Sequence, residues 1–346
     1  MLTVYNLTQA EEWDSVVRSF RDYDVYWLSG YVKAFQLHGD GEPLLFYCET
    51  DGGRGVNVVM KRDIAKDPRF AGKLPEGRYF DFATPYGYGG WLIEGEHPET
   101  MFPPYVRWCQ ESGVVSEFAR FHPTVDNASL CAQGPYKVEF LGNTVALKLD
   151  SEENIWERFS SKNRGHIRKA MKEGVTVRKE QDKAAFDTFR RIYETTMDND
   201  DASSYYYFRA SFFDSIRQDL DGHCLIFTAY LGEEPIASSI MLFANGFMNY
   251  HLSGQLFSYR KYAGTNSILY EAAKWGCANG CQWLHLGGGL GAQEGSLYTF
   301  KKSFNAKGED KKFYVGKAIF QPQTYETLMA QRRDLPESAF FPRYRA

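Results

Sequence analysis

Segments of helical and strand periodicity alternate along the chain. Apolar residues recur at helical spacing most clearly in 182–198, where Ala185, Phe186, Phe189 and Ile192 share one face. This pattern predicts an amphipathic helix packed on a sheet. Five further helices are expected at about 9–21, 98–112, 151–173, 208–220 and 264–279.

Each half of the chain contains one predicted β-hairpin. Strand-like segments flank a turn at 44–61, and the same pattern returns about 180 residues later at 225–243. A predicted helix ends at Trp108 and Gly113 before a strand, and the same order recurs at Trp275 and Gly280, 167 residues later at both positions. The repeat favours two copies of one α/β unit with a mixed sheet.

A strand candidate at 143–149 would open the second copy, so we place the domain boundary near residue 140. The expected organisation is a first domain over 1–140, a second over 141–325 and a C-terminal tail over 326–346. Because no low-complexity linker separates the copies, we expect them to pack closely and to share a cleft.

The composition describes an ordinary globular protein. Among 346 residues, 43% are hydrophobic and 24% charged, which excludes collagenous, disulfide-scaffold and disordered chains. Aromatic residues reach 16%, so we expect a partly aromatic binding groove.

The N-terminus lacks the pattern of a signal peptide, no transmembrane run occurs, and a cytoplasmic protein is expected. The six cysteines form no CxxC pair, and we predict core thiols and no metal site.

The net charge of −4 is unevenly distributed. Residues 160–183 carry eight Lys or Arg against three acids, and residues 300–317 carry six against two. This balance argues against bulk nucleic-acid binding but allows a local site for a phosphorylated ligand.

A glycine- and tyrosine-rich loop, TPYGYGG at 84–90, follows a predicted strand. Its backbone could approach a ligand closely, although the spacing fits neither a Walker A nor a dinucleotide motif. We take Tyr86, Gly87, Tyr88 and Gly89 as candidate substrate-binding residues. The alternative is an irregular turn whose tyrosines pack locally.

Two cationic patterns are candidates for binding an anion. Arg164, Arg168 and Lys172 share one face of a predicted helix and could clamp a phosphate, unless that face is merely solvated. Arg209 follows three tyrosines and a phenylalanine, a setting in which an arginine normally needs an anionic or aromatic partner.

A second glycine-rich loop, 287–291, leads to SLYTFKKSF at 296–304. Lys301 lies between Phe300 and Phe304, where a cation near apolar surface could face a developing oxyanion. The alternative is a surface lysine whose stem covers apolar neighbours.

Four segments together resemble the FemABX-type branch of the GNAT acyltransferase superfamily over about residues 1–325: the loop at 84–90, WCQESGVVSEFARFHP at 108–123, KNRGHIRKA at 162–170 and SLYTFKKSF at 296–304. The resemblance implies two tandem GNAT-like domains. Its better-studied members transfer an amino acid from aminoacyl-tRNA to an amine of a peptidoglycan precursor. It also implies that Lys301, next to Phe300, stabilises the tetrahedral intermediate, and that Arg209 contacts substrate phosphates.

The sequence departs from the family in two places. The charged coiled-coil arm with which some members bind tRNA is absent, which puts tRNA use in doubt. The loop that holds the CoA pyrophosphate in an ordinary GNAT corresponds to Lys261–Asn266, which keeps a cation at Lys261 and a glycine at Gly264 but ends in asparagine. An acyl-CoA donor is therefore weakened but stays open.

The leading hypothesis is an acyl or aminoacyl transferase with an amine acceptor, no bound cofactor, and aminoacyl-tRNA or acyl-CoA as donor. Positioning and an oxyanion contact from Lys301 would carry the catalysis, with Asp81 as a candidate for orienting the amine. Peripheral contact with a membrane follows if the acceptor is lipid-linked. The alternatives are a CoA-dependent N-acyltransferase and a non-catalytic GNAT-like module that binds a cell-wall fragment or nucleotide sugar.

Overall fold

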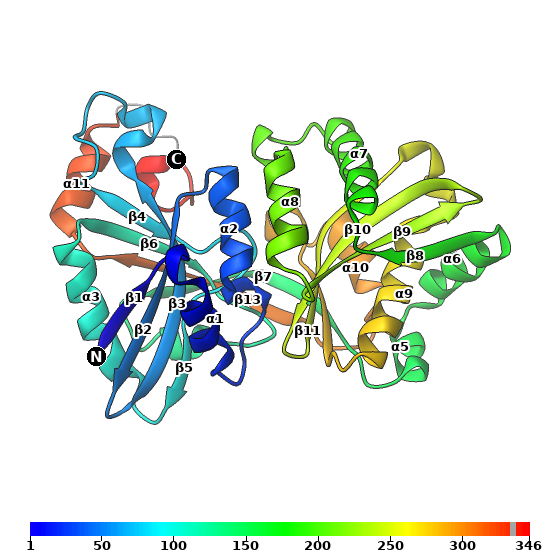
Figure 1. Ribbon diagram of the computed structural model, residues 1–346, viewed down its shortest axis with the longest axis horizontal. Helices are drawn as coiled ribbons and strands as arrows, with labels where there is room; N and C mark the ends of the chain where they lie inside the picture. The colour runs from blue at the N-terminus through cyan, green and yellow to red at the C-terminus, as the bar shows by residue number, and fades with distance from the viewer. Residues whose placement is uncertain (333–336) are drawn as a thin grey trace. The chain divides into compact units, whose positions relative to one another are not determined.

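A computed structural model describes residues 1–332 and 337–346. The chain divides into two compact units (Figure 1). Each unit has its own cluster of buried apolar side chains. Unit 1 contains Met1–Leu141 and Phe313–Ala346, and unit 2 contains Gly142–Lys312.

Unit 1 combines helices with a mixed sheet. Its strands are β1 (Leu2–Tyr5), β2 (Glu42–Thr50), β3 (Gly53–Asp63), β4 (Phe80–Ala83), β5 (Leu92–Gly95), β6 (Val114–Arg120), the first part of β7 (Lys137–Lys148) and most of β13 (Lys311–Ile319). Its helices are α1 (Ala10–Arg18), α2 (Ser29–His38), α3 (Phe102–Glu111), α4 (Ala128–Cys131) and α11 (Pro322–Ala330).

Unit 2 also combines helices with a mixed sheet. Its strands are the second part of β7, then β8 (Val175–Glu180), β9 (Cys224–Leu231), β10 (Glu234–Ala244), β11 (Phe247–Gln255) and β12 (Trp283–Gly287). Its helices are α5 (Glu152–Arg158), α6 (Ser161–Lys172), α7 (Lys183–Asn199), α8 (Ala210–Asp219), α9 (Gly264–Ala278) and α10 (Ser296–Lys302).

The two sheets have equivalent strand orders and directions. In unit 1 the order is β1-β2-β3-β4-β6-β13, and in unit 2 it is β8-β9-β10-β11-β12-β7. Each sheet contains one parallel pair, β4 with β6 and β11 with β12, and the remaining neighbours in these orders are antiparallel. This agreement confirms the expected mixed α/β class and explains the repeat seen in the sequence. The shared cleft stays a prediction.

The C-terminal part of the chain does not follow the expected domain ranges. β13 pairs with β6, so the chain returns to unit 1 from Phe313 onward instead of staying in the second domain to residue 325. The expected tail includes most of α11, and Tyr325, Leu328 and Tyr344 are buried together. Strand pairing over such a sequence distance leaves no local signal, which is why the sequence pattern missed it.

The helix expected at 151–173 is interrupted. Phe159 and Ser160 have extended backbones, and the Ser160 hydroxyl accepts a hydrogen bond from the Asn163 amide at 3.1 Å. Ser160 therefore caps a new helix, α6, because a serine at this position satisfies one of the amides left open at a helix start. The helices α2, α4, α10 and α11 were also not predicted.

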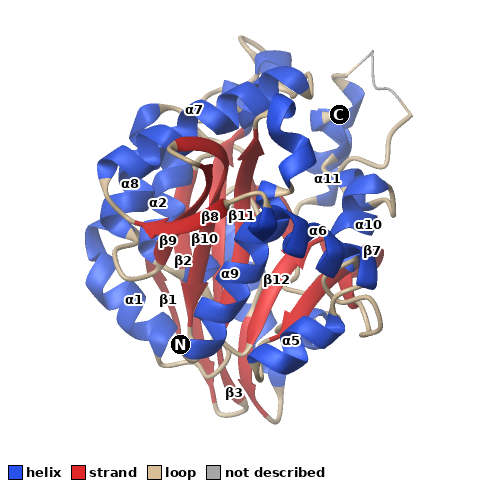
Figure 2. Cartoon of the chain, turned by 90° about the vertical axis from the view of Figure 1, so that its right-hand side faces the viewer, coloured by secondary structure: helices blue, strands red, loops and turns tan. Residues whose placement is uncertain are grey.

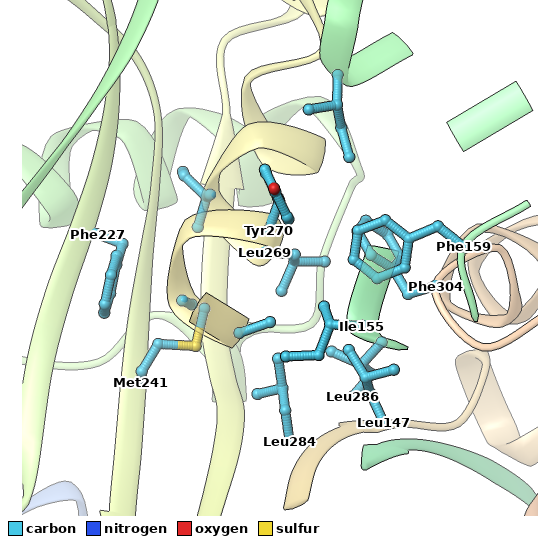
Figure 3. Close-up of a cluster of buried hydrophobic side chains, with 14 of the residues drawn as sticks. Leu147, Ile155, Phe159, Phe227, Met241, Leu269, Tyr270, Leu284, Leu286 and Phe304 are labelled. Carbon is cyan, nitrogen blue, oxygen red and sulfur yellow. The ribbon is translucent and has the colours of Figure 1, made fainter. Parts of the chain in front are cut away.

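The core of unit 2 forms around α9, which packs against the sheet with α5 and α6 beside it (Figure 2). Figure 3 shows Leu269 and Tyr270 of α9 between Phe227 and Met241 on one side and Phe159 and Phe304 on the other. α7 packs against β9, β10 and β11, as its apolar face predicts.

A buried ion-pair cluster fastens the C-terminal segment to unit 1. Asp81, on β4, is completely buried and accepts hydrogen bonds from Arg62 Nε at 2.7 Å and Arg345 Nε at 2.5 Å. The Tyr344 hydroxyl donates to the same carboxylate at 3.1 Å. Arg345 also contacts Asp67 at 2.7 Å. Burial alone would raise the pKa of Asp67, but hydrogen bonds from Arg69 and the charge of Arg345 lower it to about 2.

We predict that Arg345→Met destabilises unit 1, because it leaves the buried Asp81 carboxylate with one guanidinium in place of two. Loss of one partner of a buried pair typically costs about 3 kcal/mol. The urea midpoint followed by tryptophan fluorescence should fall clearly. Arg107→Met, at an exposed arginine of α3, is the matched control, and equal midpoints for the two variants would contradict a stabilising role for the cluster.

Candidate active site

The parallel strands β11 and β12 of unit 2 pair along a short stretch. Their ladder consists of three pairs, the last joining Asn249 to His285, although β11 continues to Gln255. In unit 1 the corresponding strands stay connected for longer, because Thr84 N and Gly89 N donate to carbonyls of β6 beyond the β4 ladder. The end of the β11–β12 ladder in unit 2 is therefore where a ligand could meet strand backbone.

Lys301 carries its amine into this region from α10. The residue is 9% exposed, and its Nζ donates to the Gly288 carbonyl at 2.7 Å. The same Nζ lies 6.0 Å from the ring centroid of Tyr250, on β11. Burial lowers the pKa of Lys301 to about 8, so the ammonium form predominates at neutral pH.

The glycine-rich loop gives Lys301 its carbonyl partner. Gly287 has φ of 78°, a left-handed conformation that favours glycine. A Cβ on Gly289 would lie 1.9 Å from the Gln293 carbonyl oxygen, so no other residue fits there without a shift of backbone. These glycines allow the tight turn that presents the Gly288 carbonyl to the amine.

The neighbouring lysine has a different role. Lys302 Nζ donates to Asp310 at 2.6 Å and to the Gly308 carbonyl at 2.7 Å, and Tyr298 donates to the same Asp310 carboxylate. Lys302 therefore holds the segment that follows α10. Phe300 is half-buried, with its ring 5.4 Å from that of Phe304, so it borders the core of unit 2.

Tyr250 was not predicted as a site residue. It lies within a β-bulge, because Met241 pairs with Tyr250 while Ile240 pairs with Leu252. Its phenol takes part in side-chain hydrogen bonds with Ser239 and Ser253, and burial raises its pKa to about 12. A bulge appears in no sequence pattern, so only the composition of β11 could have hinted at this tyrosine.

The start of α9 is the position of the degenerate CoA loop. Ala263 precedes the helix in a left-handed conformation with φ of 51° and caps it with no side-chain hydrogen bond. Lys261 is exposed, with its Nζ 5.0 Å from the Tyr262 ring centroid. Gly264 approaches β10 closely, since a Cβ there would lie 3.1 Å from that of Ala237. The first amides of α9 and Lys261 together could hold a phosphate.

The cations of α6 lie next to this helix start. Asn163 of α6 accepts a hydrogen bond from the Asn266 side chain of α9 at 2.8 Å. Arg164 donates to carbonyls at the end of α5, including that of Phe159 at 2.8 Å, which is a structural task. Arg168 is exposed and stacks over Trp156 at 5.2 Å, and Lys172 is exposed at the end of the helix.

Arg209 is exposed at the start of α8, after the turn of aromatic residues. Tyr193 of α7 donates to the Tyr206 carbonyl at 3.0 Å, and Thr196 of α7 accepts from the Gln255 amide at 2.9 Å. These bonds tie the aromatic turn to the end of β11. The start of α9 is linked to the same end of the strand, because the Thr265 hydroxyl donates to the Gln255 side chain at 2.9 Å.

The loop at 84–90 lies in unit 1 and packs against its own neighbours. The Tyr86 ring stacks on Phe35, and the Tyr31 hydroxyl donates to the Tyr86 carbonyl. Tyr88 contacts Phe313 and His122, and a Cβ on Gly87 would lie 2.6 Å from the Tyr26 ring. Gly89 forms an isolated parallel bridge with Phe121, the residue after β6. This packing favours the local-turn interpretation of the loop.

The geometry of Asp81 contradicts its suggested catalytic task. Its carboxylate is completely buried and already bound by Arg62, Arg345 and Tyr344. A carboxylate that is buried and bound by two guanidinium groups cannot reach an amine in solution, so Asp81 does not orient a substrate amine. Its place beside a glycine-rich loop was misleading, because the pairing arginine lies 264 residues away.

None of the described helices is long and apolar enough to cross a membrane. Within residues 1–332 and 337–346, no three His, Cys, Asp or Glu side chains gather as metal ligands would.

Unit 2 is similar to a known protein family. A family model described as an acetyltransferase (GNAT) domain matches residues 158–302, a segment that contains α9, the β11–β12 pair and Lys301. No curated protein matches the chain significantly.

Solved structures match over nearly the whole chain. The crystal structure of FemX covers 96% of this chain and 100% of its own, with 14% identity and a TM-score of 0.68. A conserved protein of unknown function from Bacteroides thetaiotaomicron covers 92% of this chain and 100% of its own, with 9% identity and a TM-score of 0.61. The C-terminal domain of an Agrobacterium fabrum protein described as a lysylphosphatidylglycerol synthetase covers 94% of both chains, with 12% identity and a TM-score of 0.56. The chain therefore has the GNAT acetyltransferase fold, as the sequence resemblance implied.

Proposed function

We propose that this protein transfers an activated acyl or aminoacyl group to an amine, and that Lys301 of unit 2 stabilises the oxyanion formed during transfer. The buried ammonium of Lys301 carries the proposal. Its Nζ donates to the Gly288 carbonyl, and an ammonium has three N–H donors, so donors remain for a carbonyl oxygen that gains negative charge. Charge–charge attraction of this kind is strong where water is excluded.

The chemistry needs no protein nucleophile. The acceptor amine attacks the donor carbonyl, a C–N bond forms, and the oxyanion rests on Lys301. Collapse of the intermediate breaks the ester or thioester bond, and the leaving oxygen or sulfur takes up one proton while the amine loses one. Positioning of two substrates supplies much of the rate, because the donor is already activated.

An aminoacyl-tRNA-type donor and a peptidoglycan-precursor-like or other peptidic acceptor are our first choice. The sequence resemblance to FemABX proteins and the similarity of fold to FemX support it, as does the similarity to a domain of a protein described as a lysylphosphatidylglycerol synthetase. Under this proposal charged tRNA is a transient partner, and a lipid-linked acceptor would bring the protein to a membrane surface.

An acyl-CoA donor is the second candidate, and the geometry at the start of α9 favours it. The first amides of that helix have no side-chain cap, and Lys261 is exposed three residues before Gly264. A pyrophosphate fits such a place, since helix amides and a cation both attract negative charge. A non-catalytic module that binds a cell-wall fragment or nucleotide sugar is the remaining alternative, and it would not need Lys301.

We predict that Lys301→Met lowers turnover by about 100- to 1,000-fold with little change in KM, because it deletes one donor to the oxyanion. Lys307→Met is the matched control, since Lys307 is an exposed lysine of the same unit and should keep full activity. Lys302→Met is unsuitable because it would break the pairing with Asp310. Equal turnover in Lys301→Met and wild type would exclude the catalytic role.

We predict that turnover is lost as the pH rises through about 8, because Lys301 stabilises the oxyanion only as an ammonium. The folded-state pKa lies below the ordinary value of 10.5, so burial of the cation costs stability below pH 8 and this cost disappears toward pH 10.5. Lys301→Met should therefore melt no lower than wild type at neutral pH. Rate profiles and melting curves between about pH 6 and pH 10 measure both effects. Turnover that stays constant from pH 7 to about pH 10 would contradict the assignment.

We predict that the exposed cations Arg168, Lys172 and Lys261 contribute to donor affinity. Their replacement by Gln should raise the donor dissociation constant at low salt by about tenfold, and the difference should shrink as salt rises. Thermal stabilisation by acyl-CoAs, charged tRNAs and muropeptide precursors would identify the donor class. Replacement of Lys183, Arg191 and Lys307, also exposed in unit 2, controls for net charge. If both triple variants bind the donor equally well and salt does not change their affinity, Arg168, Lys172 and Lys261 are merely solvated and do not bind the donor.

A further inference from the structure

Tyr250 owes its direction to the bulge in β11. Ser239 pairs with Ser253, and Met241 pairs with Tyr250, so these four residues share one face of the sheet. In a regular strand Tyr250 would share the face of Leu252, opposite to that of Ser253, because side chains alternate along a strand. The unpaired residue His251 shifts this alternation. The bulge therefore turns the Tyr250 ring toward the face that carries the core around α9.

Two serines hold the phenol of Tyr250 from neighbouring positions. Ser239 and Ser253 are 2.8 Å apart across the β10–β11 pair, and both make side-chain hydrogen bonds with Tyr250. Three hydroxyl groups in mutual contact leave the ring little freedom to rotate away, since buried hydroxyls lose free energy when they lose their partners. The ring is therefore anchored at its polar end.

The anchored ring faces the amine of Lys301. The Nζ lies 6.0 Å from the ring centroid, at the outer limit of a cation–π contact, while it donates to Gly288 at 2.7 Å. The carbonyl and the ring thus define the direction of the lysine side chain from two sides. Both contacts come from elements of unit 2 at the end of the β11–β12 ladder.

We propose that Tyr250 is a positioning residue for Lys301: its ring, fixed by Ser239 and Ser253, holds the ammonium at the end of the β11–β12 ladder so that the remaining N–H groups face the reacting carbonyl. This proposal rests on the proposed function of Lys301 and adds the element that orients it. Tyr250 acts through Lys301 and need not touch either substrate.

Other ionisable groups on the neighbouring elements do not account for the state of Lys301. These groups are His251 on β11, His285 on β12, and Tyr298 and Lys302 on α10, with Asp310 paired to the last two. Burial lowers the pKa of His251 to about 3, so this histidine adds no charge near neutral pH, and His285 is hydrogen-bonded to the Thr144 hydroxyl at 3.0 Å. Burial is the cause of the lowered pKa of Lys301, which leaves Tyr250 as the aromatic partner of its ammonium.

The direct test is the titration of Lys301 in the free protein. Lysine labelled with ¹³C at the ε carbon gives one signal for each lysine, and the signal lost in Lys301→Met identifies Lys301. Wild type should titrate near 8. Tyr250→Leu removes the ring and should lower this pKa by about half a unit or more, because the ammonium loses a favourable partner. Tyr250→Met should lower the pKa of Lys301 in the same way. Its longer side chain fills more of the space left by the ring than leucine does, so it serves as a second variant if Tyr250→Leu does not fold.

The conservative variant and a remote control separate positioning from structural damage. Tyr250→Phe keeps the ring but removes the phenol held by Ser239 and Ser253, so it should change the Lys301 titration and turnover less than Tyr250→Leu does. Tyr230→Leu removes a ring 4.2 Å from the Arg178 guanidinium elsewhere in unit 2 and should leave Lys301 unchanged. With substrates, Tyr250→Leu should lower kcat at least several-fold and leave KM unchanged. The loss of turnover at alkaline pH should begin at a lower pH than in wild type, in step with the lower pKa of Lys301.

An unchanged Lys301 titration in both Tyr250→Leu and Tyr250→Met would overturn the proposal, as would an equal effect of Tyr230→Leu. These outcomes are independent of the catalytic assignment, because the titration needs no substrate. If Lys301→Met keeps full activity while the titration responds to Tyr250, the proposed function fails and the contact between Tyr250 and Lys301 remains.

Discussion

Burial of one amine is the constraint on which the candidate site depends. A lysine that is 9% exposed must be compensated, because an ammonium loses most of its hydration inside a protein. Here the compensation comes from one carbonyl, at Gly288, and from the face of Tyr250. That carbonyl is available because Gly287 adopts a left-handed conformation and Gly289 leaves room for the Gln293 carbonyl. The glycine-rich loop, the helix α10 and the bulge of β11 therefore all serve the same side chain.

The two units use equivalent sheets for different purposes. In unit 1 the backbone beyond β4 continues to pair with β6, and the face near Asp81 is occupied by Tyr344 and Arg345 of the same unit. In unit 2 the corresponding ladder stops after Asn249 and His285, and the chain places Lys301 there. A shared strand order thus does not imply a shared chemistry, since function depends on the side chains that a fold presents.

Local patterns predicted the parts of the fold that depend on local forces. The hairpins, the repeat and the amphipathic helix α7 were visible because turn residues and apolar spacing act over a few positions. The break at Phe159 was missed because apolar spacing continues through it, and the return of β13 to unit 1 was missed because strand pairing is long-range. At β13 a long-range pairing decides the fold, whereas at Ser160 a serine cap begins a new helix and apolar spacing does not reveal it.

The candidate site was only partly predictable for the same reason. Lys301 could be singled out from its apolar neighbours and glycine-rich loop, but Lys301 and Lys302 look alike in sequence. Only the fold shows that one amine is buried beside Tyr250 and the other is paired with Asp310. Asp81 failed as a candidate because its guanidinium partners come from distant segments, and Tyr250 was overlooked because a bulge directs it.

Detection of the transferred group tests the central claim most directly. The purified protein would be incubated with a heavy-isotope-labelled acyl or aminoacyl donor, as the CoA thioester and as charged tRNA, together with a set of amine acceptors. Mass spectrometry would then follow the label into an amide. The account predicts a labelled amide from one donor class with wild type, and almost none with Lys301→Met. A labelled amide formed equally well by both proteins, or donor binding with no transfer to any acceptor, would contradict it.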